Sequence, residues 1–208
     1  MEYYKEPRWR EKKKFDNRNT SKKRTPDKKK SNTKSLNPDL FIKKAGTVSK
    51  KEYKSFRLID QLPVSRSIIT NLQNKGYTSP TEIQDKTIDA ILSGKNLMGL
   101  AQTGTGKTAA FLITIFNDQL CHPLQGERFV GEPRALVIAP TRELVMQIAA
   151  DAEELGKYTG LQVATLIGGM DYQKQLNRLT NTVVDLVVAT PGRLLDFMGR
   201  RDLYLDHV

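Results

Sequence analysis

A glycine-rich stretch near the middle of the chain carries the residue types that bind nucleotide phosphates. Residues 101–108 read Ala-Gln-Thr-Gly-Thr-Gly-Lys-Thr, which nearly fits the phosphate-loop pattern G-x-x-x-x-G-K-[ST], with alanine at the first position. Gly104 and Gly106 let the backbone curl so that its N–H groups point at phosphate oxygens. Lys107 would reach the β- and γ-phosphates, and the hydroxyl of Thr108 would bind Mg²⁺. The pattern therefore predicts a nucleoside triphosphate site.

The whole loop supplies candidate nucleotide-binding residues: Ala101, Gln102, Thr103, Gly104, Thr105, Gly106, Lys107 and Thr108. Lys107 and Thr108 are also the candidate catalytic residues, and Thr108 is the candidate metal ligand. A plain glycine-rich turn with a solvated lysine would explain the glycines alone. The complete Gly-Lys-Thr ending, between an apolar run and a helix-like stretch, favours the phosphate loop. The loop alone does not say which base is bound.

Short apolar runs alternate with amphipathic stretches from about residue 56 onward, and this alternation predicts the fold. Strands are expected at residues 96–101, 135–139, 162–167 and 185–189. Helices are expected at residues 65–75, from 79, through 109–112, and at 142–158, 172–179 and 193–199. Such βαβ units indicate an α/β fold with a parallel sheet covered on both faces. Right-handed crossovers would place all the strand-to-helix turns, including the phosphate loop, at one edge of the sheet.

Two helix ends are marked by their residues. Gly76 is suited to the left-handed conformation that closes the first helix. Ser79 is the expected N-cap of the second helix, with Pro80 in its first turn and Glu82 completing a capping box.

The positive charge is concentrated before the folded part. Residues 1–55 contain nineteen Lys or Arg and seven Asp or Glu, whereas residues 56–208 contain fifteen and sixteen. Residues 1–55 are predicted to be a disordered basic tail, because their few apolar residues fit no helix or strand period. Residues 56–208 are predicted to be one domain. A polyanion such as RNA is the natural partner of the tail, although a solubilising tail without a specific partner would have the same composition.

The single cysteine, Cys121, excludes an internal disulfide and fits a reducing compartment. The chain shows no signal-peptide core and no run of about 20 apolar residues, so no membrane association is expected. A cytoplasmic location is expected, with a nuclear one the alternative if the source is eukaryotic.

Five short motifs in a fixed order resemble those of the DEAD-box RNA helicases. Residues 76–84 are similar to the Q motif, and residues 101–108 are similar to that family's phosphate loop, in which the first alanine is normal. Residues 140–144 resemble motif Ia, Gly168-Gly169 the following glycine pair, and residues 190–193 motif Ib. The stretches 131–136 and 169–172 are most similar to the bacterial RhlB-type branch. The resemblance implies a RecA-like domain that binds ATP and Mg²⁺.

The resemblance also implies how the adenine is bound. Gln84 would hydrogen-bond the adenine edge, since a planar amide offers one donor and one acceptor. Tyr77 and Thr81 of the same motif are further candidate cofactor-binding residues. In the family an aromatic residue upstream stacks on the base. The usual spacing leads to Ile59, whereas the aromatic Phe56 lies three residues earlier, so the stacking residue stays open between these two.

The remaining motifs imply contacts to the sugar-phosphate backbone of RNA, which carry no sequence information. The candidate RNA-binding residues are Pro140, Thr141, Arg142, Gly169, Thr190, Pro191, Gly192 and Arg193. Local explanations exist for some of them. Arg142 could pair with Glu143 or another acid, and Thr190-Pro191 could be a plain helix N-cap and first-turn proline.

The family's Asp-Glu-Ala-Asp box and Ser-Ala-Thr motif, which follow motif Ib, do not occur among the 208 residues. We therefore expect a RecA-like domain that is incomplete at its C-terminus, a piece of a longer enzyme that by itself binds ATP and RNA without hydrolysis. The expected function of the parent is ATP-dependent opening of RNA duplexes. The alternatives are a non-catalytic RNA-binding module with a passively occupied loop and a different phosphate-loop translocase. The Q motif disfavours the translocase. Protein partners are not indicated by the sequence.

Overall fold

The fold is built on a parallel sheet of short, apolar strands. The structure is a computed structural model that describes residues 53–208. The strands β1 (Ala135–Ile138), β2 (Val163–Leu166) and β3 (Leu186–Ala189) pair in parallel in the order β1-β3-β2. Leu186 of β3 lies opposite Ala135 on one side and Val163 on the other. Because β3 is the central strand, all four of its residues are buried.

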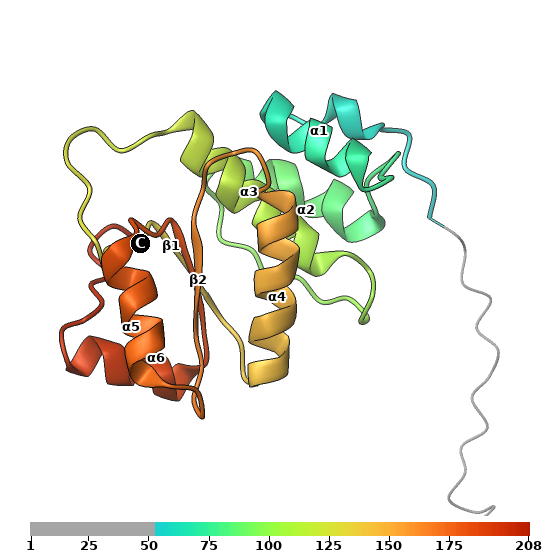
Figure 1. The fold of residues 1–208 in the computed structure, drawn as a ribbon. Coiled ribbons are helices and arrows are strands. Elements are labelled where there is room, and N and C mark those ends of the chain that lie inside the picture. Colours follow the sequence, from blue (N-terminus) through green and yellow to red (C-terminus); the bar gives the residue numbers. More distant parts are fainter. Residues whose placement is uncertain (1–52) are drawn as a thin grey trace, which may run out of the picture. The chain divides into compact units, whose positions relative to one another are not determined.

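The two faces of the sheet are covered by different helices (Figure 1). Leu186 and Val188 of β3 point into a cluster with α3 (Lys107–Cys121) and α4 (Arg142–Leu155). Their neighbours Val187 and Ala189 point into a second cluster with α5 (Tyr172–Asn181) and α6 (Pro191–Gly199). This alternation is the period of two that a strand imposes on its side chains. The predicted α/β class with a doubly covered parallel sheet is confirmed.

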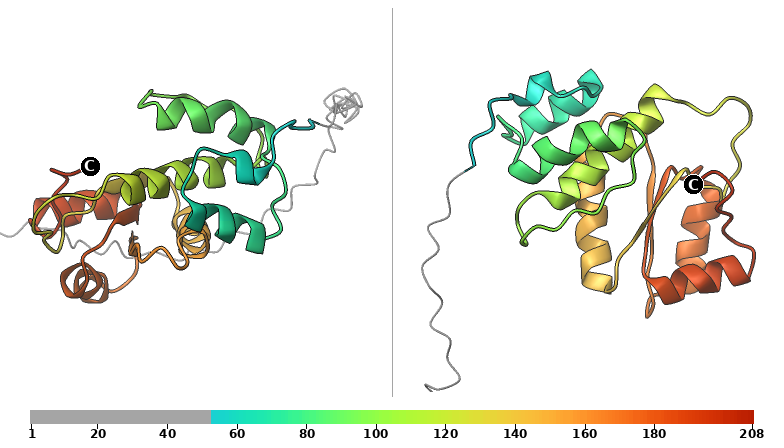
Figure 2. Two further views of the ribbon diagram at one scale, coloured as in Figure 1. Left: turned by 90° about the horizontal axis from the view of Figure 1, so that it is seen from above. Right: turned by 180° about the vertical axis from the view of Figure 1, so that it is seen from behind.

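Two further helices lie beside α3, on the side of the sheet opposite α5 and α6 (Figure 2). These are α1 (Arg66–Asn74) and α2 (Glu82–Leu92), and a 3-10 turn, η2 (Ile59–Gln61), precedes them. Gly76 has a φ of +80° after the end of α1, as its sequence position predicted. Among residues 53–208, no helix has both the length and the apolar character that spanning a membrane requires.

Two predictions of local structure are wrong. Residues 96–101 form no strand, and Met98 and Leu100 are 88% and 90% exposed. A strand exists only when its backbone pairs with another strand, and none of the strands in the described part of the chain lies beside this segment. The predicted N-cap of α2, Ser79, is also wrong. The N-cap is Thr81, whose backbone is extended and whose N–H donates to the Gln84 side chain and not to a carbonyl of an earlier helical turn.

The predicted tail lies almost wholly outside the described residues. Its last three residues, 53–55, are described, and two of them contact α2. Tyr53 and Ser55 both donate hydrogen bonds to Asp85. The predicted domain boundary at residue 55 therefore falls inside a segment that is attached to the folded part.

Candidate nucleotide and nucleic-acid site

The phosphate loop has the glycine conformations that its pattern predicts. Gly104 and Gly106 have φ values of +77° and +89°, in the region that favours glycine. Gly106 is the N-cap of α3, so the loop runs directly into the positive end of a helix of 15 residues. A Cβ on Gly106 would lie 2.5 Å from Gln84 Nε2, so this position has no room for a side chain.

Lys107 lies across the loop. Its Nζ donates to the carbonyl oxygens of Ala101, at 2.5 Å, and Gln102, at 2.6 Å. The hydroxyl of Thr105 donates to the same Gln102 oxygen at 2.8 Å. Because both partners of Lys107 are neutral carbonyls, a phosphate with formal negative charge would compete strongly for its ammonium group. The neighbouring Thr108 is half-buried in the first turn of α3.

Gln84 connects the start of α2 to the phosphate loop. Its side chain is 1% exposed, its Oε1 accepts from the Thr81 N–H at 3.0 Å, and its Nε2 donates to the Gly106 carbonyl at 3.1 Å. The hydroxyl oxygen of Thr81 is buried beside Gly106 and has no hydrogen-bond partner within the described residues. Tyr77, in contrast, is half-buried and packs against the main apolar cluster. The structure thus brings Gln84 and Thr81 to the loop, while Tyr77 supports the core.

The two candidates for stacking on adenine have opposite surroundings. Ile59 is 2% exposed and belongs to the core, whereas Phe56 is fully exposed. Phe56 lies in a segment that carboxylates of α2 hold in place. We call residues 53–57 the anchored segment.

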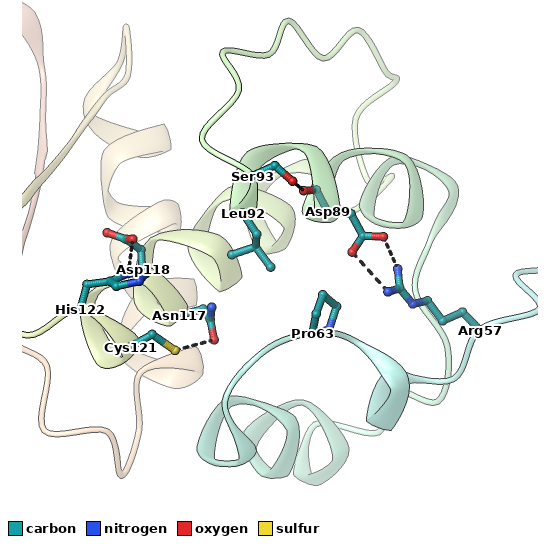
Figure 3. Close-up of a pocket in the computed structure, with 9 residues that line it drawn as sticks. All are labelled: Arg57, Pro63, Asp89, Leu92, Ser93, Asn117, Asp118, Cys121 and His122. Carbon is teal, nitrogen blue, oxygen red and sulfur yellow. Dashed lines mark hydrogen bonds and ion pairs between the residues drawn. The ribbon is translucent and has the colours of Figure 1, made fainter.

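The anchored segment contacts two acids one turn apart on α2. Asp85 accepts hydrogen bonds from the hydroxyls of Tyr53, at 2.5 Å, and Ser55, at 2.8 Å. Asp89 pairs with Arg57, at 2.9 and 3.2 Å (Figure 3). The hydrogen bonds from Tyr53 and Ser55, aided by the charge of Arg57, lower the pKa of Asp85 from its ordinary value. Sequence reasoning missed these acids; their only signal is the i, i+4 spacing on the helix that carries Gln84.

The candidate RNA-binding residues lie where the strands end. Thr141, the N-cap of α4, follows β1, and its hydroxyl accepts from the Leu144 N–H at 3.2 Å. Thr190, the N-cap of α6, follows β3, and its N–H donates to Leu166 at the end of β2. Pro191 occupies the first turn of α6, and Pro140 and Gly192 are exposed. The carboxyl ends of the strands therefore gather these motifs at one edge of the sheet.

Two arginines approach the turn after β2 from different helices. A Cβ on Gly169, which has a φ of +74°, would clash with Nη1 of Arg142. Arg193 donates from Nη2 to the Met170 carbonyl at 3.1 Å. No ion pair joins Arg142 to Glu143 or to any other acid between residues 53 and 208. Two cationic groups are thus held around residues 168–170, in an arrangement suited to phosphate groups.

The described residues offer no ready-made metal centre. In that part of the chain, no three His, Cys, Asp or Glu side chains gather closely enough to hold an ion. A Mg²⁺ ion carried in with a nucleotide fits the loop better, because Thr108 follows Lys107 at the helix N-terminus and nucleotide-bound Mg²⁺ needs few protein ligands.

A cavity of about 530 Å³ lies beside the Arg57–Asp89 ion pair of the anchored segment (Figure 3). It is lined by residues from the C-terminal halves of α2 and α3, including Asp89, Asn117 and His122, and by Pro63. The phosphate loop is at the opposite end of α3, about 22 Å away at 1.5 Å per residue. This cavity is therefore remote from the phosphate loop, although it borders the segment that carries Phe56.

A parallel α/β sheet with a glycine loop leading into a helix, and with cationic groups at the carboxyl edge of its strands, defines a phosphate-loop nucleotide-binding domain. Comparison with known proteins then identifies the family. The family model described as DEAD/DEAH box helicase matches residues 81–208, and the chain belongs to this family. The resemblance drawn from the sequence motifs is confirmed.

Relatives share these features over part of their length. The chain is 54% identical over 142 residues to the ATP-dependent RNA helicase RhlB of Pseudomonas aeruginosa (strain UCBPP-PA14), covering 68% of this chain and 36% of the relative. It is 47% identical over 139 residues to the ATP-dependent RNA helicase SrmB of Haemophilus influenzae, covering 67% and 31%. The structure of a hypothetical ATP-dependent RNA helicase from Sulfolobus tokodaii matches with a TM-score of 0.57 and 39% identity, covering 66% and 37%. The chain spans about a third of the length of the curated relatives it matches.

Proposed function

We propose that this chain is the ATP-binding and RNA-gripping part of an enzyme that couples ATP hydrolysis to local opening of RNA duplexes. The names of the relatives, ATP-dependent RNA helicases, support the reaction. The observation that carries the proposal is Gln84, which is buried against Thr81 and hydrogen-bonded to Gly106 of the phosphate loop. An amide in this place can link recognition of the base to the position of the phosphates.

The phosphate end of ATP would be held by the loop and the start of α3. The helix N-terminus offers unpaired N–H groups to the phosphate oxygens, and Lys107 exchanges its two carbonyl partners for phosphate oxygens. Mg²⁺ bound with the nucleotide would neutralise the charge that develops on the phosphates, with the Thr108 hydroxyl as the ligand from this chain.

The base would lie between Gln84 and Phe56. Ile59 is buried in the core and Phe56 is exposed, so Phe56 is the one of these two side chains that can stack on adenine. The anchored segment keeps Phe56 near α2, the helix that carries Gln84.

RNA would be gripped through its backbone at the carboxyl edge of the sheet. Arg142 and Arg193 would contact phosphates. The backbone N–H groups of the first turns of α4 and α6, which follow the N-caps Thr141 and Thr190, would be further donors. The basic tail would add affinity without sequence preference. The cytoplasm, where thiols stay reduced, suits the free thiol of Cys121.

Nucleotide titration tests the ATP site. We expect ATP to bind more tightly than GTP, and Lys107→Ala to reduce ATP affinity by roughly 10-fold or more, since a charged hydrogen bond contributes about 1.5–3 kcal/mol. Gln84→Ala should reduce the preference for ATP over GTP. Lys157→Ala, on an exposed residue beyond α4, is the matched control and should leave nucleotide affinity unchanged. Equal binding of ATP and GTP by the wild type would contradict a base-reading role of Gln84.

A further inference from the structure

Tyr172, the first residue of α5, lies where the proposed RNA-binding elements meet. Its ring stacks on Phe197 of α6, with centroids 4.3 Å apart and planes inclined by 25°. Phe197 is fully buried in the cluster between the sheet, α5 and α6. The ring therefore joins the start of α5 to the middle of α6.

Two guanidinium groups from α6 and its C-terminal end lie near the same ring. The Cζ atom of Arg200 is 4.5 Å from the Tyr172 ring centroid, and that of Arg193 is 5.5 Å away. Both distances are within the range of cation–π attraction. Asp196 links the two arginines: its carboxylate pairs with Arg200 Nε at 2.8 Å and lies 4.0 Å from Arg193 Nε.

The hydroxyl of Tyr172 is fixed as well. It donates to the carboxylate of Asp202, in the turn after α6. Burial, and then this hydrogen bond, raise the pKa of Tyr172 to about 12.

Arg193 is held with one nitrogen unused. Its side chain is 13% exposed, its Nη2 donates to the Met170 carbonyl, and its Nη1 is buried without a hydrogen-bond partner among the described residues. A guanidinium fixed in this way loses little conformational entropy when it pairs with a phosphate.

We infer that Tyr172 is a positioning residue for RNA binding: its ring, stacked on Phe197, holds the Arg193 guanidinium against the turn at residues 168–170, where the exposed part of the Arg193 side chain meets an RNA phosphate. This inference rests on the proposed function, because it needs Arg193 to contact RNA. An apolar side chain could replace the packing on Phe197. At position 172 an aromatic ring also attracts the two guanidinium groups, which an apolar side chain would not do.

Three variants of the full chain separate positioning from packing. Tyr172→Phe keeps the ring and loses the hydroxyl, Tyr172→Leu keeps apolar volume and loses the ring, and Arg193→Ala removes the proposed contact. Affinity for a single-stranded RNA is measured against salt concentration, at raised salt where the tail contributes less. Nucleotide affinity and thermal unfolding report whether each variant is folded. If Tyr172→Leu unfolds, Tyr172→Met takes its place, since methionine fills irregular space.

We expect Tyr172→Phe to bind RNA within about 2-fold of wild type, and Tyr172→Leu to bind roughly 3- to 20-fold more weakly, as loss of a cation–π contact predicts. In the Arg193→Ala background, Tyr172→Leu should add no further loss. An equal loss in both backgrounds, or no loss in Tyr172→Leu alone, would overturn the inference while leaving the RNA role of Arg193 intact. If Arg193→Ala itself binds RNA normally, the proposed RNA contact fails, and the positioning role fails with it.

Discussion

Gln84 uses both ends of its amide inside the protein, and this makes Gly106 a critical residue of the nucleotide site. The Gly106 carbonyl accepts from Gln84, and its Cα hydrogens face the same amide at a distance that excludes a methyl group. Thr81 Oγ1 would lie 3.0 Å from that methyl group. Position 106 therefore requires glycine for two reasons: its φ is positive, and there is no space for a side chain.

These two reasons can be separated by mutation. Gly106→Ala should lower the free energy of unfolding by about 2–3 kcal/mol, because left-handed strain adds to the clash with Gln84. Gly94→Ala is the matched control. Its φ is +75° and its surroundings are open, so only about 1–2 kcal/mol of strain is expected. In a Gln84→Ala background most of the extra cost of Gly106→Ala over Gly94→Ala should disappear, leaving the close contact with Thr81 Oγ1, as measured by urea unfolding in a double-mutant cycle. An extra cost that is undiminished without the Gln84 side chain would disprove the clash with Gln84.

Residue types and spacing predicted the phosphate loop, because its glycines act through local backbone geometry. They could not predict the anchored segment, since the hydrogen bonds from Tyr53 and Ser55 to Asp85 join residues about 30 positions apart. The contact between Tyr172 and Arg193 escaped prediction for the same reason.

At the scale of elements, periodicity predicted β1, β2, β3 and the helices between them closely, since each has a buried face that repeats. The strand predicted at residues 96–101 is absent, although the sequence of this segment is equally apolar. Its conformation depends on a pairing partner and not on its own residues. The predicted N-cap of α2 was two residues too early. The helix begins after Thr81, whose N–H is paired with the Gln84 side chain.

Attachment of the anchored segment to α2 should depend on pH. The folded-state pKa of Asp85 lies below its ordinary value, so the carboxylate contributes stability above pH about 4 and loses it as the pH falls through the lower, folded value. We expect Asp85→Asn to lower the free energy of unfolding by about 1 kcal/mol at pH 7, and the difference from wild type to shrink toward zero in acid, as the pH falls through the lowered pKa of Asp85. ATP affinity should also fall, because Phe56 is then held mainly through the Arg57–Asp89 pair.

The control for this prediction is Asp60→Asn in the 3-10 turn. Asp60 is an exposed acid and makes no side-chain hydrogen bond or ion pair within residues 53–208. Its substitution should leave stability unchanged at neutral pH and in acid. If Asp85→Asn matches wild type at neutral pH, the attachment of the segment does not contribute to stability.

At the scale of the whole molecule, charge is divided unevenly between the two parts of the chain. Residues 56–208 carry fifteen basic and sixteen acidic side chains, so the folded part has almost no net charge with which to attract RNA from a distance. The RNA contacts proposed at the carboxyl edge of the sheet would therefore act at short range. The excess positive charge lies in the tail, which would set the encounter rate and the non-specific affinity.

Removal of residues 1–52 tests this division. For single-stranded RNA, log K falls with log salt by about 0.7 for each phosphate neutralised, so the slope counts the ionic contacts. The full chain should give a steep slope, and residues 53–208 should retain a shallow slope that reports the few contacts made by Arg142, Arg193 and their neighbours. Arg193→Ala should reduce the slope of residues 53–208 by about 0.7, a change hardly visible in the full chain. Nucleotide affinity provides the control, since the phosphate loop lies in the part that remains. A slope that is unchanged after the deletion would place the ionic grip on the folded domain and remove the proposed role of the tail.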